Sequence, residues 1–277
     1  MDAFQTPPKP LAYRNYVLVA LLSFFLTAML YGQTFAHDFV YFDDDGYVLN
    51  HAMVRAGLSF DGLKWAFQSL DMANWHPLTW VSYMLDASLF GMEPGWFLLH
   101  NALLHAANGV LVFTILWRLG RHIPSALFGS VIFVVHPLHV ESVAWIAERK
   151  DVLSGLFYLL GLIVYLRWMD ERDWPRYFAV IVLCALALMA KPMAVTFPLV
   201  LVLFDLFLAR RKLVEAVLEK APLFLMCLGA GIATLLAQGD GGAVSGFDIH
   251  SLELRLSNTV IGYTTYLRQF LVPTELA

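Results

Sequence analysis

Charged residues are scarce in this chain of 277 residues, since Asp, Glu, Lys and Arg make up 14% of it, against about 25% in soluble domains. Hydrophobic residues make up 59% and gather in long runs, which excludes a soluble α/β enzyme. The net charge of −4 provides no basic field, so no nucleic-acid partner is expected. No G-x-x-x-x-G-K-[ST] or G-x-G-x-x-G occurs, which excludes the common nucleotide-binding loops. The only cysteines, Cys184 and Cys227, lie within apolar runs, and no disulfide is expected.

Long apolar segments are the main feature of the sequence. A helix of about 20 apolar residues crosses about 30 Å of hydrocarbon. Seven segments come close to this requirement: 16–34, 96–117, 125–135 continuing toward 145, 152–168, 177–190, 193–209 and 221–238. The expected fold is an all-α polytopic membrane protein of about seven transmembrane helices, forming one domain over 1–277. A secretory signal peptide is the alternative for the first segment, because Thr34-Phe35-Ala36 resembles a cleavage site.

The distribution of Lys and Arg predicts the orientation. With the N-terminus inside, eleven of these residues flank the inner ends of the spans and seven flank the outer ends, so the positive-inside rule predicts a cytoplasmic N-terminus. The long loop 35–95 then faces outward. Within it, helical spacing of apolar residues predicts an interfacial helix over 59–70 with Asp61 as its N-cap. A second external segment, 239–277, is expected to carry an amphipathic helix over 252–272.

Polar residues gather at the outer ends of the predicted spans. Placing an ionisable side chain in or near hydrocarbon is unfavourable, so each of these residues is a candidate for a function. The first group is Asp43, Asp44 and Asp45. Neighbouring carboxylates raise one another's pKa, which suits one of them to act as a general base. A solvated acidic turn or a cation-binding loop is the alternative.

A second group lies in the 96–117 segment, where Asn101, His105 and Asn108 share one helical face and His100 lies beside them. Such a stripe is expected to face the bundle interior. Its members could contact substrate, or they could simply hydrogen-bond between helices.

A third group follows the third span. His136, His139 and Glu141 have a spacing that could ligate zinc, although Pro137 breaks the helical register between them. Further along, Glu148-Arg149-Lys150-Asp151 places two cations and two acids at the mouth of the fourth span. Arg149 and Lys150 could hold a phosphate leaving group or snorkel to lipid headgroups.

A fourth site is Lys191, between the fifth and sixth segments, where Lys191-Pro192 predicts a tight hairpin apex. An outward lysine runs against the positive-inside trend, which makes it a candidate anion contact. Acids, imidazoles and cations thus converge on the outer face. A transporter would instead be expected to place such groups near the membrane midplane.

Several motifs together resemble one family. They are Phe42-Asp43-Asp44, Trp75-His76-Pro77-Leu78-Thr79-Trp80, His136-Pro137-Leu138-His139-Val140-Glu141-Ser142-Val143-Ala144-Trp145, Glu148-Arg149-Lys150-Asp151 and Ala190-Lys191-Pro192-Met193. In this order they resemble the membrane portion of the transmembrane-and-tetratricopeptide-repeat O-mannosyltransferases and their bacterial relatives, which belong to the GT-C superfamily of glycosyltransferases.

The resemblance implies an inverting transferase that moves a hexose, typically mannose, from a polyprenyl-phosphate donor to a hydroxyl of a protein or glycan acceptor outside the cytoplasm. The superfamily's acidic pair matches Asp43 and Asp44 here. His76, His136, His139, Glu141, Arg149, Lys150, Asp151 and Lys191 are then the candidate sugar or phosphate contacts. No cofactor is required, although a divalent cation could bind at Asp43 and Asp44. In a bacterium the protein would lie in the inner or plasma membrane.

Two departures from the family pattern matter. Asp45 adds a third acid and leaves open which carboxylate is the base. The family's tetratricopeptide repeats do not follow the membrane segments, so the chain is expected to be a fragment. The alternatives are a lipid-linked-sugar flippase, which predicts inverted repeats that the sequence does not display, and a non-catalytic membrane anchor.

Overall fold

The computed structural model describes residues 11–240 and 251–274. Within them every regular element is helical. The α-helices are α1 Tyr13–Tyr31, α2 Ala52–Arg55, α3 Phe60–Gln68, α4 Pro77–Phe90, α5 Pro94–Gly120, α6 Ile123–Val135, α7 Val140–Ala144, α8 Arg149–Asp170, α9 Trp174–Ala190, α10 Phe197–Phe207, α11 Leu213–Glu219, α12 Ala221–Asp240 and α13 Leu252–Leu271.

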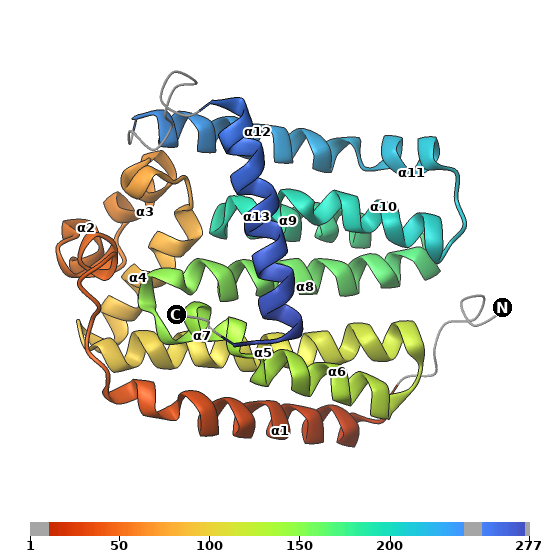
Figure 1. The fold of residues 1–277 in the computed structure, drawn as a ribbon, viewed down its shortest axis with the longest axis horizontal. Helices are drawn as coiled ribbons and strands as arrows, with labels where there is room; N and C mark the ends of the chain where they lie inside the picture. Colours follow the sequence, from red (N-terminus) through yellow and green to blue (C-terminus); the bar gives the residue numbers. More distant parts are fainter. Residues whose placement is uncertain (1–10, 241–250, 275–277) are drawn as a thin grey trace.

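Apart from α13, the long helices lie side by side, and the chain runs back and forth between the two ends of the bundle (Figure 1). One end carries α2, α3, α4 and α7 together with the start of α8, and we call it the capped end. The opposite end carries the short connections after α5, α8 and α10. This alternation brings the capped end together from segments far apart in the sequence.

All seven predicted apolar segments are helical, which confirms an all-α fold. Among the described residues, four helices are long and apolar enough to cross a membrane: Tyr13–Ala36, Pro94–Gly120, Ile146–Asp170 and Ala221–Gly239. A fifth candidate is the pair Ile123–Val135 and Pro137–Ala144, which is bent by 49°. Trp174–Ala190 and Pro192–Phe207 are shorter apolar helices. Seven spans are therefore not confirmed.

Local sequence explains where several helices begin. Proline stands in the first turn of α4, α5, α6, α9 and α10, where its missing N–H breaks no helical hydrogen bond. The predicted N-cap of the loop helix was wrong. Ser59 caps α3 by accepting from the Gly62 N–H at 3.0 Å, and Asp61 lies in the first turn, where a carboxylate favours the helix dipole.

Small residues let α1, α5 and α6 approach closely. A Cβ on Gly109 would lie 2.4 Å from a Val134 methyl and 2.6 Å from Ser23 Oγ. Ser23 Oγ donates to the Ala106 carbonyl and Ser130 Oγ to the Gly109 carbonyl, both at 2.7 Å. Small and hydroxyl side chains at a helix crossing are typical of membrane bundles.

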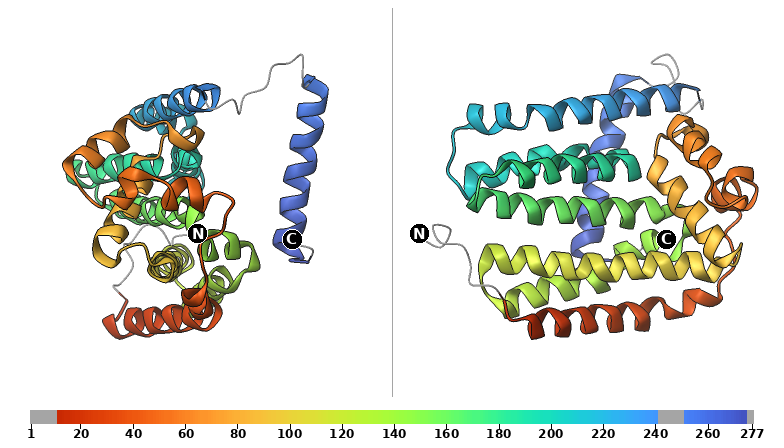
Figure 2. Two further views of the ribbon diagram at one scale, coloured as in Figure 1. Left: turned by 90° about the vertical axis from the view of Figure 1, so that its left-hand side faces the viewer. Right: turned by 180° about the vertical axis from the view of Figure 1, so that it is seen from behind.

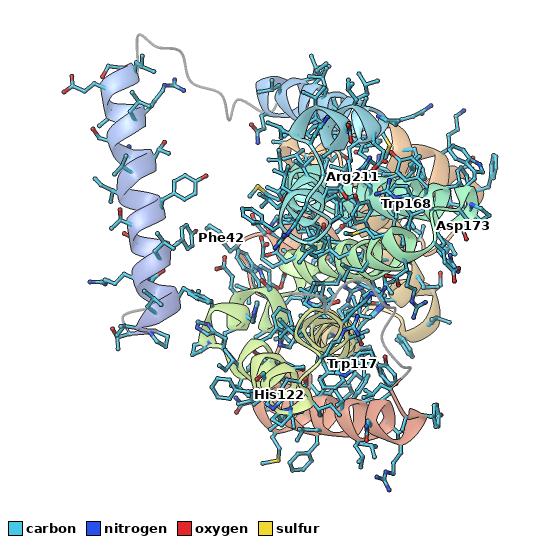
Figure 3. All side chains as sticks on the ribbon, turned by 90° about the vertical axis from the view of Figure 1, so that its right-hand side faces the viewer. Phe42, Trp117, His122, Trp168, Asp173 and Arg211 are labelled. Carbon is cyan, nitrogen blue, oxygen red and sulfur yellow. The ribbon has the colours of Figure 1, made fainter. Side chains whose placement is uncertain are left out.

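Helix α13 stands apart from the bundle in both side views (Figures 2 and 3). It has no buried residue. It contacts the bundle at His136, which hydrogen-bonds the Phe270 carbonyl at 3.0 Å and stacks on the Phe270 ring. The predicted external segment 239–277 lies in part outside the described residues, because 241–250 and 275–277 are not among them.

Candidate functional site

Two cavities meet at Lys191 near the capped end. The first, of about 360 Å³, lies between α5, α6, α7 and α8, and we call it the α5–α8 cavity. The second, of about 520 Å³, lies against α12, and we call it the α12 groove. Lys191 and Met193 line both. They belong to the turn after α9, so the predicted hairpin apex forms the partition between the two spaces.

Acids and cations alternate around this partition. Lys191 forms ion pairs with Asp151 and with Glu148, the latter at 3.4 Å. Glu148 also pairs with Lys150 at 2.8 Å, and Lys150 Nζ lies 4.9 Å from the centre of the Tyr47 ring. An ammonium group has three donors, so both lysines retain donors for an anion. The structure therefore brings together three of the predicted contacts, Lys150, Asp151 and Lys191.

His76 lies in the wall of the α12 groove beside the two lysines. Its ring is fully buried, packs against Tyr47 and Trp80, and neither ring nitrogen has a hydrogen-bond partner among the described residues. Burial, reinforced by the charges of Lys150 and Lys191, lowers the pKa of His76 to about 3. A neutral imidazole with an unused N–H beside two ammonium groups is suited to donate to a phosphate oxygen.

This burial predicts a pH dependence of stability. The unfolded chain protonates His76 near pH 6.5, but the folded chain does so only near pH 3. As the pH falls from 7 to 5, protonation of His76 in the unfolded chain alone should therefore lower the free energy of unfolding by about 2 kcal/mol. His76→Asn should remove that part of the pH dependence of thermal unfolding in detergent, whereas His37→Asn, at an exposed histidine, should leave it unchanged. An unaltered pH profile in His76→Asn would contradict the burial.

The acidic triplet is divided between two environments. Asp44 is 1% exposed, and its two oxygens accept from the backbone N–H groups of Val40 at 2.9 Å and Ala147 at 2.8 Å. Burial raises the pKa of Asp44, and these hydrogen bonds oppose the rise. Asp44 thus fastens the first loop to the segment before α8. Each oxygen of Asp44 already accepts one backbone hydrogen bond and the side chain is buried, so Asp43 is the more accessible of the two predicted bases.

Asp43 is half-buried, and no hydrogen bond or ion pair joins its carboxylate to another described residue. After burial itself, the Asp43 charge is the next cause that raises the pKa of Tyr47, followed by that of Glu148. The Asp43 charge therefore acts on Tyr47, and the centre of the Tyr47 ring lies 4.9 Å from Lys150 Nζ. Asp45 is half-buried in the next turn.

Arg149 requires a correction to the sequence-based assignment. It is fully buried, forms an ion pair with Asp86, and donates to Asn101 Oδ1 at 2.8 Å and to the Phe97 carbonyl at 2.7 Å. It lines neither cavity. These partners hold the guanidinium inside the protein and outside both cavities, which gives Arg149 a structural role and leaves its predicted role in holding a leaving phosphate to experiment.

The polar stripe of α5 does face the bundle interior, as predicted. Asn101 donates to the Trp145 carbonyl at 3.0 Å, His105 bonds the Val134 carbonyl at 3.0 Å, and Asn108 donates to the Val152 carbonyl at 2.8 Å. His100 hydrogen-bonds Asp86 at 2.8 Å. These contacts join helices, and only His105 and Asn108 also line the α5–α8 cavity.

The histidine motif after α6 splits in the same way. His139 lines the α5–α8 cavity, His136 faces α13, and Glu141 is exposed. Among the described residues, no group of three or more His, Cys, Asp or Glu side chains is placed to hold a metal ion. The zinc alternative for this motif therefore has no suitable ligand set.

Three residues in these contacts were not predicted from the sequence, two at the α12 groove and one beside Arg149. Asp86 is the buried partner of Arg149, Asn74 lines the α12 groove, and Tyr47 lies under Lys150. An acid inside the apolar run of α4 was the one available signal for Asp86, because a carboxylate there needs a partner.

Comparisons with known proteins agree with the resemblance. Protein O-mannosyl-transferase Tmtc2 of Drosophila melanogaster is 34% identical over 194 residues, covering 65% of this chain and 21% of that protein. Protein O-mannosyl-transferase tmtc2 of Xenopus laevis is 30% identical over 210 residues, covering 69% of this chain and 24% of that protein. Human TMTC1, with the same enzyme name, is 30% identical over 157 residues, covering 52% and 17%.

These matches show that the chain is related to protein O-mannosyl-transferases. The chain spans about a fifth of the length of the first two curated relatives it matches. No family model matches it, and no solved structure does.

Proposed function

We propose that this chain is the membrane part of a glycosyltransferase that moves a hexose, most simply mannose, from a polyprenyl-phosphate donor to a hydroxyl acceptor such as a protein Ser or Thr. The observation that carries the proposal is the α12 groove, in which an apolar wall ends at two lysines, Lys150 and Lys191. Such a surface matches an isoprenoid chain that ends in a phosphate.

The apolar wall comes mainly from one face of α12. Its lining residues run from Cys227 to Gln238, a length of about 16 Å at 1.5 Å per residue. Leu228 and Leu235 on this face are 61% and 65% exposed, so the groove is open on the side where lipid would lie. His76, Lys150 and Lys191 line its polar part, where the donor's phosphate would bind.

Asp43 is the proposed general base. Its carboxylate takes the proton of the acceptor hydroxyl, and the hydroxyl oxygen forms a bond to the anomeric carbon of the sugar. The bond between that carbon and the phosphate oxygen breaks, and the polyprenyl phosphate leaves with the electron pair. Lys150 and Lys191 stabilise the charge that develops on the phosphate. Asp44 acts as a positioning residue that holds the loop of Asp43 in place.

The seven-span topology remains part of this proposal. Helices α9 and α10 are short, but they lie alongside α8 and α12 in the bundle (Figure 1), and crossing the bilayer there would keep the cavities at one membrane face. The excess of Lys and Arg at the opposite end supports a cytoplasmic position for that end. The capped end, with the site, would then be extracytoplasmic.

A cysteine-protection experiment tests the α12 groove. In a Cys184→Ala/Cys227→Ala background, which has no other cysteine, Leu235→Cys places a thiol in the groove. We expect polyprenyl phosphate to slow its modification by a maleimide at least tenfold, because the isoprenoid chain would cover the thiol. The measurement is the rate of modification in detergent against lipid concentration.

Leu225→Cys in the same background is the matched control. Leu225 is 68% exposed, close to the 65% of Leu235, and lies on the same helix but does not line the groove. Equal protection of both thiols would indicate non-specific coating by lipid, and the donor assignment of the groove would then be lost.

A further inference from the structure

The α5–α8 cavity lies on the other side of Lys191 from the α12 groove, and both spaces are lined by Lys191 and Met193. A polyprenyl-phosphate sugar has three parts in a row, a hydrocarbon chain, a phosphate and a ring bearing hydroxyls. The structure presents three neighbouring environments: the apolar α12 groove, the cations Lys150 and Lys191, and the α5–α8 cavity, whose largely apolar walls carry several polar side chains. Because Lys191 lines both spaces, a phosphate bound there has room for its chain on one side and its sugar on the other.

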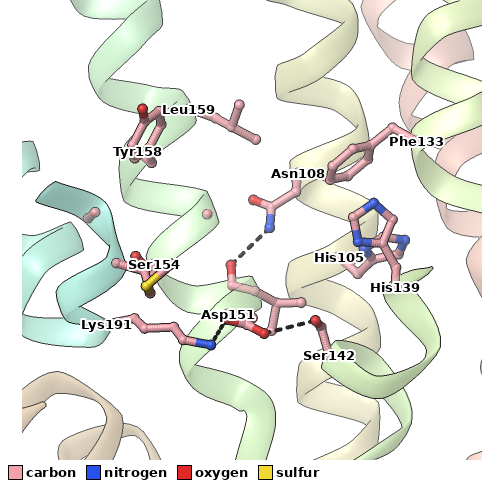
Figure 4. A pocket seen from close by; sticks show the side chains of 14 residues that line it. His105, Asn108, Phe133, His139, Ser142, Asp151, Ser154, Tyr158, Leu159 and Lys191 are labelled. Atoms are coloured by element: carbon pink, nitrogen blue, oxygen red, sulfur yellow. Dashed lines mark hydrogen bonds and ion pairs between the residues drawn. The ribbon is translucent and has the colours of Figure 1, made fainter. Parts of the chain in front are cut away.

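The lining of the α5–α8 cavity suits a polyhydroxylated ring. Carboxylate, amide, imidazole and hydroxyl groups come from Asp151, Asn108, His139 and Ser142, and the rings of Phe133 and Tyr158 add flat apolar surface. Figure 4 shows Phe133 and His139 on one side of the space and Tyr158 and Lys191 on the other. Its volume, about 360 Å³, is that of a small ligand site.

Asn108 supplies the strongest sign that a ligand is expected. Its side chain is 2% exposed. The amide nitrogen donates to the Val152 carbonyl at 2.8 Å, but the amide oxygen has no partner among the described residues. A buried acceptor without a donor is destabilising, and a ligand hydroxyl would supply the donor. Gly155 allows this arrangement, since a Cβ there would lie 3.2 Å from the Asn108 amide nitrogen.

Asp151 lies where the cavity meets the cation cluster. It accepts from Ser142 Oγ at 3.0 Å and pairs with Lys191, so a sugar hydroxyl next to the phosphate would find a carboxylate acceptor there. His139 has its ring 4.5 Å from Phe133 and 5.1 Å from His105, measured between ring centres. No hydrogen bond occupies the His139 ring nitrogens within the described residues.

We propose that the α5–α8 cavity binds the hexosyl group of the donor, with Asn108 Oδ1 and the His139 ring hydrogen-bonding its hydroxyls. This inference rests on the proposed function, because it requires the lipid phosphate to occupy the α12 groove. It adds sugar recognition to that function and assigns it to Asn108 on α5 and His139 after α6.

The test compares two lipids in the Leu235→Cys protection experiment: polyprenyl phosphate and polyprenyl-phosphate mannose. In the parent protein the mannose ester should protect at a lower concentration than the bare phosphate. The ratio of the protecting concentrations of bare phosphate and mannose ester measures this preference. Asn108→Leu and His139→Phe should each lower the ratio roughly three- to tenfold, as expected for the loss of one hydrogen bond. Protection by the bare phosphate should be unchanged in both variants.

Ser23→Ala is the structural control. Like Asn108→Leu, which removes the hydrogen bond to Val152, it removes an interhelical hydrogen bond of α5. Ser23 does not line the cavity, so Ser23→Ala should leave the stronger protection by the mannose ester unchanged. If both cavity variants keep the full preference for the mannose ester, or weaken both lipids equally, the subsite is overturned. If bare polyprenyl phosphate fails to protect even the parent protein, the donor groove itself is overturned and the subsite with it.

Discussion

Asp43→Asn should lower the rate of sugar transfer by about 10²–10⁴-fold, the usual contribution of a general base, while leaving thermal unfolding nearly unchanged. The Asp43 carboxylate has no hydrogen bond or ion pair among the described residues, so its replacement by an amide breaks neither kind of contact there. The measurement is transfer of radiolabelled mannose from polyprenyl-phosphate mannose to acceptor peptides by the purified protein.

Asp44→Asn and Asp45→Asn separate the roles within the triplet. Asp44→Asn should reduce transfer and also lower the melting temperature, because the amide cannot accept from both the Val40 and Ala147 N–H groups. Asp45→Asn should change the rate least. Undiminished transfer in Asp43→Asn, combined with abolished transfer in a stably folded Asp44→Asn protein, would move the base to Asp44.

Arg149→Met should destabilise the fold by about 3–5 kcal/mol, because it leaves the Asp86 carboxylate buried without its cation. Asp86 is 1% exposed and Arg149 is fully buried. The guanidinium carbon also lies 5.0 Å from the centre of the Tyr83 ring and 5.5 Å from that of Phe97. Thermal unfolding in detergent, followed by tryptophan fluorescence, measures the loss.

The double variant Asp86→Leu/Arg149→Met tests the cause. Removing both charges leaves no unpaired ion, so the double variant should be clearly more stable than Arg149→Met alone. Transfer per folded molecule should then fall far less than in Asp43→Asn. If the Arg149→Met protein is stable but has a strongly raised KM for the donor, Arg149 does bind the leaving phosphate.

The residues around the two cavities show which parts of the site could be predicted from the sequence. Lys150, Asp151 and Lys191 were expected at the same membrane face, and in the structure they lie together at the capped end. The expectation that Arg149 would join them was wrong, although it is the immediate neighbour of Lys150. In the first turn of α8 these two side chains point about 100° apart, so one lies in the protein interior and the other in the groove.

By itself the sequence determined that the protein is an all-helical membrane protein related to O-mannosyl-transferases, and which face of α5 turns inward. The helical fold and the inward-facing polar side chains follow from the hydrocarbon environment, because every unpaired polar group within it is costly. Only the tertiary structure decided which polar groups are satisfied by one another and which remain for a ligand. That choice depends on the partner that each side chain meets across the bundle: Asp86 for Arg149 and the backbone of Val40 and Ala147 for Asp44, with none found among the described residues for Asp43, His76 or the oxygen of Asn108.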